Sequence, residues 1–268
     1  PSLSSASNTV LYMYYGDASV ASQQDATNVW DSNYKAVYHL KEDPAVAGAN
    51  GIIDSTSNAN HGTDINTVGT VTGQIDGSLN FTGAGYVEAP NSTSLNISGT
   101  AITVSFWANV TDTGGDSVLL EKAVAGPTFY QYAVEFDGNA AKTFDFYFRD
   151  TGGTLRVSSM TPTAGVLQYS VFTYNGANVI GYLNGVQRVS TAQTTSLQTS
   201  LLPFRLGGDY NTTPGQLYTG KIDEVRISNV VRAAGWITTE FNNQGTPTTF
   251  YAVGSATSPT ANFFQLFE

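Results

Sequence analysis

The chain has 268 residues, long enough for one large β domain or two ordinary ones, and contains no cysteine. Its net charge of −10, from 21 acidic and 11 basic residues, repels phosphate backbones and argues against a nucleic-acid partner. The lack of cysteine excludes disulfides and thiolate metal sites, and no apolar run is long enough to insert directly into a membrane. A bound metal would therefore depend on oxygen ligands, and calcium is the first candidate.

Apolar residues alternate with polar ones along most of the chain. This period-two pattern predicts half-buried antiparallel strands at residues 9–16, 102–110, 132–138, 144–150, 167–176 and 179–189. Asn184-Gly185 predicts a two-residue type I′ hairpin turn inside the last of these segments. Residues 230–242 form the one candidate helix, weakened by Gly235. Many strands without helical alternation predict an all-β, two-sheet antiparallel sandwich or jelly roll.

Five segments occur in an order typical of one family. The segments at residues 54–63, 77–90, 102–110, 172–187 and 220–228 together resemble LamG-like, concanavalin A-like jelly rolls of bacterial surface proteins. Residues 10–17 with 28–40 resemble the end of a DUF2341-type β domain that precedes such jelly rolls. The resemblance implies three parts, which are residues 1–36 from the preceding domain, residues 37–254 as the jelly roll and residues 255–268 as a linker or tail.

The resemblance also bears on catalysis. It implies two antiparallel sheets, one of them concave, in a fold that lectins, glucanases and spacers share, so function must be argued from sites. Retaining glucanases of this fold carry Glu-x-Asp-x-x-Glu on one strand, because two carboxylates must act together. The nearest matches, Glu135 with Asp137 and Asp223 with Glu224, lack the third carboxylate. We therefore expect no catalytic residues and no enzyme activity.

A metal site is implied by the same resemblance. In this fold class a structural calcium is held by an aspartate of the terminal strand and by oxygens from an N-terminal segment and a hairpin. Asp223 stands at the terminal-strand position, Asp54 and Asn60 lie in a polar loop, and Gly77 belongs to the hairpin. The alternative is that this loop is only a turn, which Asp, Asn and Gly also favour. His61 is unsuited to calcium, and we expect it to fix the loop by a hydrogen bond.

Loop tyrosines are the candidates for ligand binding, because glycan recognition uses exposed aromatic faces beside fixed polar groups. The candidate residues are Tyr130, Asp209, Tyr210, Asn211 and Tyr218. Packing in the sandwich is the alternative role for these tyrosines. We predict an extracellular or cell-surface adhesion module of a larger protein that binds a glycan or a surface protein. A spacer without a small ligand and a polysaccharide-active enzyme remain the alternatives.

Overall fold

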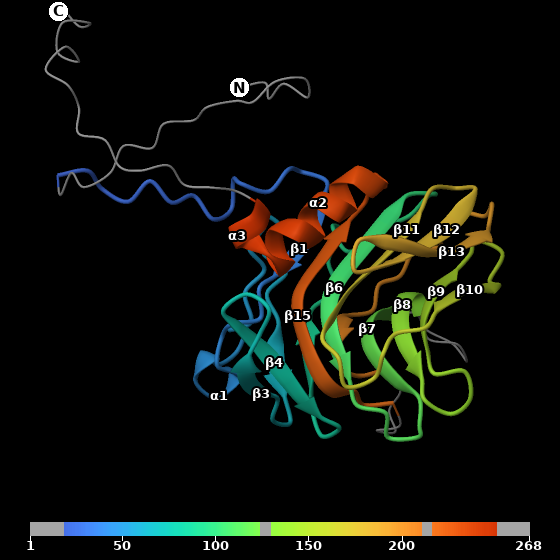
Figure 1. The fold of residues 1–268 in the computed structure, drawn as a ribbon, viewed down its shortest axis with the longest axis horizontal. Coiled ribbons are helices and arrows are strands. Elements are labelled where there is room, and N and C mark those ends of the chain that lie inside the picture. The colour runs from blue at the N-terminus through green and yellow to red at the C-terminus, as the bar shows by residue number, and fades with distance from the viewer. Residues whose placement is uncertain (1–18, 124–129, 211–215, 251–268) are drawn as a thin grey trace, which may run out of the picture.

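The computed structural model describes residues 19–123, 130–210 and 216–250, which form two antiparallel sheets packed face to face (Figure 1). The first sheet runs in the order β13 (Val186–Ala192), β12 (Asn178–Leu183), β11 (Gln168–Tyr174), β6 (Ile102–Val110), β15 (Thr219–Ser228), β4 (Gly77–Thr82) and β3 (Gly69–Thr72). In the same sheet, β1 (Tyr34–Tyr38) pairs with β15. The predicted all-β sandwich is thereby confirmed.

The second sheet packs against the first. Its order is β10 (Leu155–Met160), β9 (Thr143–Arg149), β8 (Tyr130–Asp137), β7 (Ser117–Ala123), β14 (Phe204–Leu206), β5 (Tyr86–Ala89) and β2 (Thr63–Ile65). The helices are α1 (Pro44–Ala47), α2 (Ala234–Gly245) and α3 (Pro247–Phe250). The predicted domain boundary at residue 37 falls inside β1, so the sandwich sheet already begins at Tyr34.

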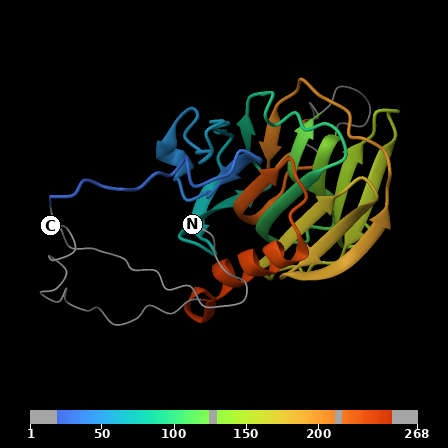
Figure 2. The same cartoon turned by 90° about the horizontal axis from the view of Figure 1, so that it is seen from above.

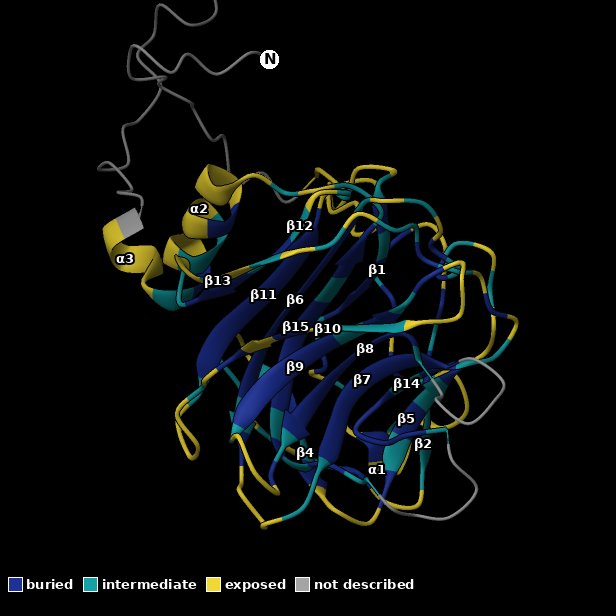
Figure 3. Cartoon of the chain, turned by 90° about the vertical axis from the view of Figure 1, so that its right-hand side faces the viewer, coloured by how far each residue is buried: buried dark blue, intermediate teal, exposed yellow. Residues whose placement is uncertain are grey.

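The core lies between the sheets and follows the alternation in the sequence. Phe144, Phe146 and Phe148 occupy every second position of β9 and are completely buried. Figure 3 shows β9 coloured as buried along most of its length. Phe144 meets the ring of Phe106 from β6 edge to face at 5.9 Å, and Phe146 stacks on Phe172 from β11 at 5.4 Å. These ring pairs join the two sheets, because apolar side chains on the inner faces have no other place to bury.

Helix α2 covers part of the outer face of the first sheet (Figure 2). Its Ile237 and Phe241 pack on Trp107 of β6 and Tyr169 of β11, which form a second apolar cluster outside the main core. The helix was predicted at residues 230–242 but begins later, because the preceding Ala233 has an extended backbone with ψ 155°. The two short helices, α1 and α3, were not predicted.

The Asn184-Gly185 turn has the predicted conformation. Both residues have positive φ, at 52° and 75°, and Leu183 pairs with Val186 across the turn. A type I′ turn requires this backbone, and it matches the twist of the flanking strands. The turn also lies against helix α2, because the Gly185 carbonyl accepts a hydrogen bond from Thr238 Oγ1 at 3.1 Å.

Substituting Gly207 by alanine tests how tightly the sheets pack. Gly207 has φ 80°, and an added Cβ would lie 2.2 Å from Phe81 Cδ1 in the core. Gly114 has nearly the same φ, 81°, but open space around it. Gly114→Ala should cost about 1–2 kcal/mol from backbone strain. Gly207→Ala should cost about 2 kcal/mol more from overpacking. Equal losses in urea unfolding would show that the core adapts to the extra methyl group.

Candidate functional site

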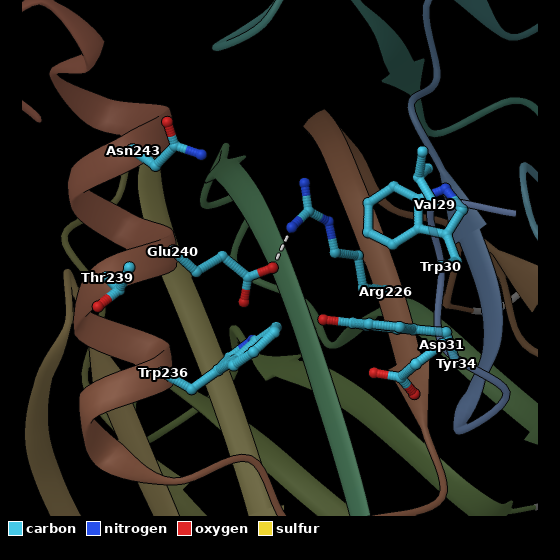
Figure 4. A pocket seen from close by; sticks show the side chains of 9 residues that line it. All are labelled: Val29, Trp30, Asp31, Tyr34, Arg226, Trp236, Thr239, Glu240 and Asn243. Atoms are coloured by element: carbon cyan, nitrogen blue, oxygen red, sulfur yellow. Dashed lines mark hydrogen bonds and ion pairs between the residues drawn. The ribbon is translucent and has the colours of Figure 1, made fainter. Parts of the chain in front are cut away.

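A pocket of about 490 Å³ opens between the segment that leads into β1 and helix α2 (Figure 4). Its volume falls in the range of small-molecule sites, about 300–1,000 Å³. The lining side chains are Val29, Trp30, Asp31 and Tyr34 from the N-terminal side, Arg226 from β15, and Trp236, Thr239, Glu240 and Asn243 from the helix. Two segments far apart in the sequence therefore build one site.

Guanidinium groups lie over the aromatic rings of the pocket wall, one from the lining residue Arg226 and one from Arg232, which does not itself line the pocket. The Arg232 guanidinium lies 4.1 Å from the Tyr34 ring centroid and 4.9 Å from that of Trp236. Arg226 lies 5.1 Å from the Trp30 ring centroid, and Trp30 meets Tyr34 edge to face at 5.2 Å. Cations over aromatic faces hold these rings in place. Trp236 remains 48% exposed, so part of the aromatic surface is open to a ligand.

The charged floor of the pocket is internally paired. Arg226 donates to Glu224 at 2.6 Å and also forms an ion pair with Glu240, while His39 Nδ1 lies 2.7 Å from the other Glu224 oxygen. Burial opposes ionisation of Glu224, but the hydrogen bonds and charges of His39 and Arg226 outweigh it and lower its pKa. Tyr169 Oη donates to the second Glu240 oxygen at 2.5 Å. The floor is thus a compensated network, and exposed polar groups remain only at the rim.

Sequence reasoning missed this pocket because its two walls come together only after folding. Trp30 and Trp236 lie near opposite ends of the sandwich sequence, one in the segment 28–40 and one in the candidate helix 230–242, and nothing in either segment predicts that they meet. One signal was available, since the chain has 3 tryptophans and two of them line the pocket. A rare, large aromatic residue outside the alternating strands is a candidate for a binding surface.

The predicted ligand residues are separated by the structure. Tyr130, Asp209 and Tyr210 lie near one another on the outer face of the second sheet, where Arg205 stacks 4.8 Å from the Tyr210 ring and donates to the Asp209 carbonyl. Tyr218 is fully buried and packs edge to face on Phe81, so its predicted role at the rim is wrong. Asn211 lies outside the described residues.

The polar loop around Asp54 is anchored by hydrogen bonds within the protein. The Asp54 carboxylate accepts from the backbone N–H groups of Val37, Thr56 and Asn60 at 2.8–2.9 Å, and from Thr56 Oγ1 at 3.0 Å. Four donors fill its acceptor positions, so the structure gives no support to Asp54 as a metal ligand. His61 Nδ1 accepts from Asp54 N at 3.1 Å, which confirms its expected role in fixing the loop.

Asn60 also serves this loop. The side-chain amide of Asn60 donates to the Lys35 carbonyl at 2.7 Å and to Ser94 Oγ at 2.9 Å. The backbone carbonyl of Asn60 accepts from Tyr38 Oη. These bonds tie the loop to β1 and to a neighbouring turn. These hydrogen bonds give Asp54 and Asn60 a role in anchoring the loop, and their predicted metal roles stay predictions.

Asp223 and Gly77 fit the implied calcium better. Asp223 is fully buried, and in the described residues its carboxylate accepts only backbone N–H bonds, from Gln74, Ile75 and Glu224. A Cβ on Gly73 would lie 2.5 Å from both Asp223 Oδ2 and the Gly77 carbonyl oxygen, so these two acceptors share one small space. In the described part of the chain no three acidic or histidine side chains are placed to hold one metal ion, so most calcium ligands here would be carbonyls or water.

Residues 81–238 match the family model described as the concanavalin A-like lectin/glucanases superfamily, Laminin_G_3. The chain belongs to this family, as the sequence resemblance indicated. No curated protein matches the chain. Within the described residues, no helix is both long and apolar enough to cross a membrane. The likeness of residues 1–36 to a preceding domain stays a prediction.

Three solved structures have the same fold. The binding domain of Paraclostridial Mosquitocidal Protein 1 is 14% identical with a TM-score of 0.61, covering 79% of this chain and 52% of that one. The botulinum neurotoxin serotype G binding domain is 13% identical with a TM-score of 0.60, over 80% and 52%. Domain 4 of AbnA, an extracellular arabinanase of Geobacillus stearothermophilus solved with arabinotriose, is 18% identical with a TM-score of 0.58, over 77% and 97%. The chain spans about half the length of the two toxin domains.

Chelation tests the calcium prediction. An ion bound only to the folded state at a hundredfold excess over its Kd stabilises that state by about 2.7 kcal/mol. We therefore predict that EDTA lowers the melting temperature and that Asp223→Asn removes this sensitivity. Asp54→Asn, the control, should destabilise the loop but keep the response to EDTA. An unchanged wild-type transition in EDTA would contradict a structural calcium.

Acidification should stabilise the fold through Glu135. Burial raises the pKa of Glu135 from 4.5 to about 7, against a smaller opposing hydrogen bond from Tyr130. Because the folded state holds this proton more tightly, the stabilisation by Glu135 is complete below about pH 4.5 and is lost as pH rises through 7. This contribution of Glu135 to the unfolding free energy is about 3 kcal/mol. Urea unfolding of Glu135→Gln should lose this pH dependence, and an unaltered slope between pH 5 and 8 would contradict the assignment.

Proposed function

We propose that this chain is an extracellular, non-enzymatic binding module that recognises a neutral glycan in the pocket between residues 29–34 and helix α2. The observation that carries this proposal is the pair of tryptophans, Trp30 and Trp236, facing an open pocket of about 490 Å³. Support also comes from the fold, which this chain shares with the arabinanase domain solved with arabinotriose.

The chemistry of the pocket suits a sugar. Apolar C–H faces of a sugar ring stack on indole and phenol rings, while its hydroxyl groups need nearby hydrogen-bond partners. Thr239 and Asn243 supply exposed polar groups at the rim, beside Asp31, whose carboxylate is paired with Arg232. A charged ligand is disfavoured, because Arg226 and Arg232 are already paired with carboxylates and a buried unpaired charge is costly.

Catalysis is the weaker alternative. The carboxylates on the outer face of the second sheet, Glu121, Glu135 and Asp145, belong to three different strands and do not reproduce the glucanase pattern on one strand. The similar solved structures described above are mainly binding domains. A spacer that binds nothing small is the other alternative, and the binding experiment below separates it from the glycan proposal.

Trp236→Ala should weaken glycan binding at least tenfold, a loss of about 1.4 kcal/mol. A panel of neutral oligosaccharides on a microarray identifies the ligand, and calorimetry then measures its affinity. The melting temperature should change little, since the side chain is 48% exposed. Tyr210→Ala, on the opposite sheet, is the matched aromatic control and should bind as the wild type.

Two outcomes would reject the pocket. If Tyr210→Ala abolishes binding and Trp236→Ala does not, the glycan binds the outer face of the second sheet, as the sequence suggested. If the wild type binds no oligosaccharide on the array, the spacer alternative gains support and the proposed function fails.

A further inference from the structure

Glu121 on β7 is buried and poorly satisfied. Its side chain is 0% exposed, and in the described residues neither carboxylate oxygen accepts a hydrogen bond of full geometry, although the Tyr210 backbone lies close enough to favour the ionised form. An unsatisfied buried acceptor costs about 1–3 kcal/mol, and more for a charged group. Such a group in a folded protein requires an explanation, and a missing ligand is one.

Two further carboxylates share its face of the sheet. In the β7–β8 ladder Glu121 pairs with Ala133, two residues before Glu135, and in the β8–β9 ladder Glu135 pairs with Asp145. Side chains at i and i+2 of a strand lie on one face, and diagonal neighbours are about 7–8 Å apart. The register therefore gathers three carboxylates from three adjacent strands.

The partners of these two neighbours leave acceptor capacity. Glu135 accepts from Tyr130 Oη at 2.9 Å, but its other oxygen has only a long contact, 3.4 Å, with the Gln216 amide. Asp145 accepts from Thr143 Oγ1 at 2.7 Å and from Tyr147 Oη at 3.2 Å. All of these partners are neutral, so none compensates a negative charge.

The nearby cations form their ion pairs and hydrogen bonds with other groups. Arg205 lies opposite Glu121 in the β14–β7 ladder and its charge favours ionised Glu121, but its ion pair, at 2.7 Å, is with Glu88. Its guanidinium lies between the rings of Tyr86 and Tyr210, at 4.2 and 4.8 Å from their centroids. Lys122 follows Glu121 in the chain but donates to Asn91 Oδ1 at 2.6 Å on the other side of the strand. The face therefore has more negative than positive charge.

We propose that this face is a second binding site, separate from the tryptophan pocket, which takes a protonated primary amine between Glu121 and Glu135. An ammonium group has three N–H donors and no acceptor, which matches a site that offers acceptors only. The rings of Tyr130 and Tyr147, 5.5 Å apart, lie beside these carboxylates and suit a cation. A metal ion is disfavoured, because no three acidic or histidine groups in the described residues are close enough to share one.

Proton release should accompany amine binding. Burial holds the pKa of Glu121 well above its usual range, with Asp209 and Glu135 adding to the effect and Arg205 and the Tyr210 backbone opposing it. Burial likewise raises the pKa of Glu135 to about 7, with Asp116, Asp145 and Asp137 adding to it. A bound ammonium favours the ionised carboxylates, so each carboxylic acid that pairs with it gives its proton to the buffer.

The test uses n-butylamine, which is protonated at pH 7, and n-butanol as its neutral counterpart of similar shape. NMR titration of the wild type should show saturable binding of the amine near Glu121 and Tyr147, and none of the alcohol. In ¹³C spectra the carboxyl titration midpoints of Glu121 and Glu135 should fall in the presence of the amine. A purely structural role for Glu121 would leave these midpoints unchanged.

Glu121→Gln should weaken amine binding at least tenfold, because it keeps the shape and removes the charge. Asp112→Asn, an acidic residue paired with Lys142 at the surface, is the control and should bind normally. Glu135→Gln gives the same test if Glu121→Gln fails to fold. Equal binding of butanol, no saturable amine binding, or full binding by the glutamine variants would overturn the proposal. Trp236→Ala should retain amine binding, so this test is independent of the glycan pocket.

Discussion

Strand β15 changes partners halfway along its length. The implied calcium site at Asp223 and the tryptophan pocket both depend on that change. Its first half, through Ile222, pairs with β4, whereas its second half, from Val225, pairs with β1, and β6 lies along the other edge throughout. Between the halves the β15–β6 register shifts, and Glu224 takes a left-handed backbone with φ 49°. Irregularities of this kind bend a strand and re-aim its side chains.

The bulge sends neighbouring carboxylates to different environments. Asp223 turns to the backbone N–H groups of Gln74 and Ile75, while Glu224 joins His39 and Arg226 beneath the pocket. Burial opposes the charge on Arg226, but Glu240 and Glu224 more than offset this and raise its pKa. Removing one member of such a buried group leaves an uncompensated charge, which makes the network rigid and intolerant of change.

Local sequence patterns were sufficient to predict the fold but not the tryptophan pocket. The alternating phenylalanines of β9 and the Asn184-Gly185 turn follow from periodicity and from backbone preference, which act over a few residues. The tyrosines could not be sorted in that way. Tyr210 is half-buried beside Arg205, whereas Tyr218 lies in the core, although both come from one loop-rich stretch. Their burial depends on which elements pack against them in the folded protein. The tryptophan pocket needs β1 to pair with β15 and α2 to fold back, and neither long-range contact has a local signature.

The antiparallel pairing of β1 with β15 has a mechanical consequence. Tyr34, at the start of β1, lies opposite Ser228, at the end of β15, so the chain enters and leaves this ladder at the same point. A force that pulls apart the segment before Tyr34 and the segment after Ser228 would open the ladder one residue pair at a time. It would not load all the hydrogen bonds of the ladder at once. Just outside that point, Arg232 is held by Asp31 and lies against the Tyr34 ring. A pull on these two segments would load this ion pair and ring contact before the first residue pair of the ladder, so residues beside the tryptophan pocket should also resist unfolding under force.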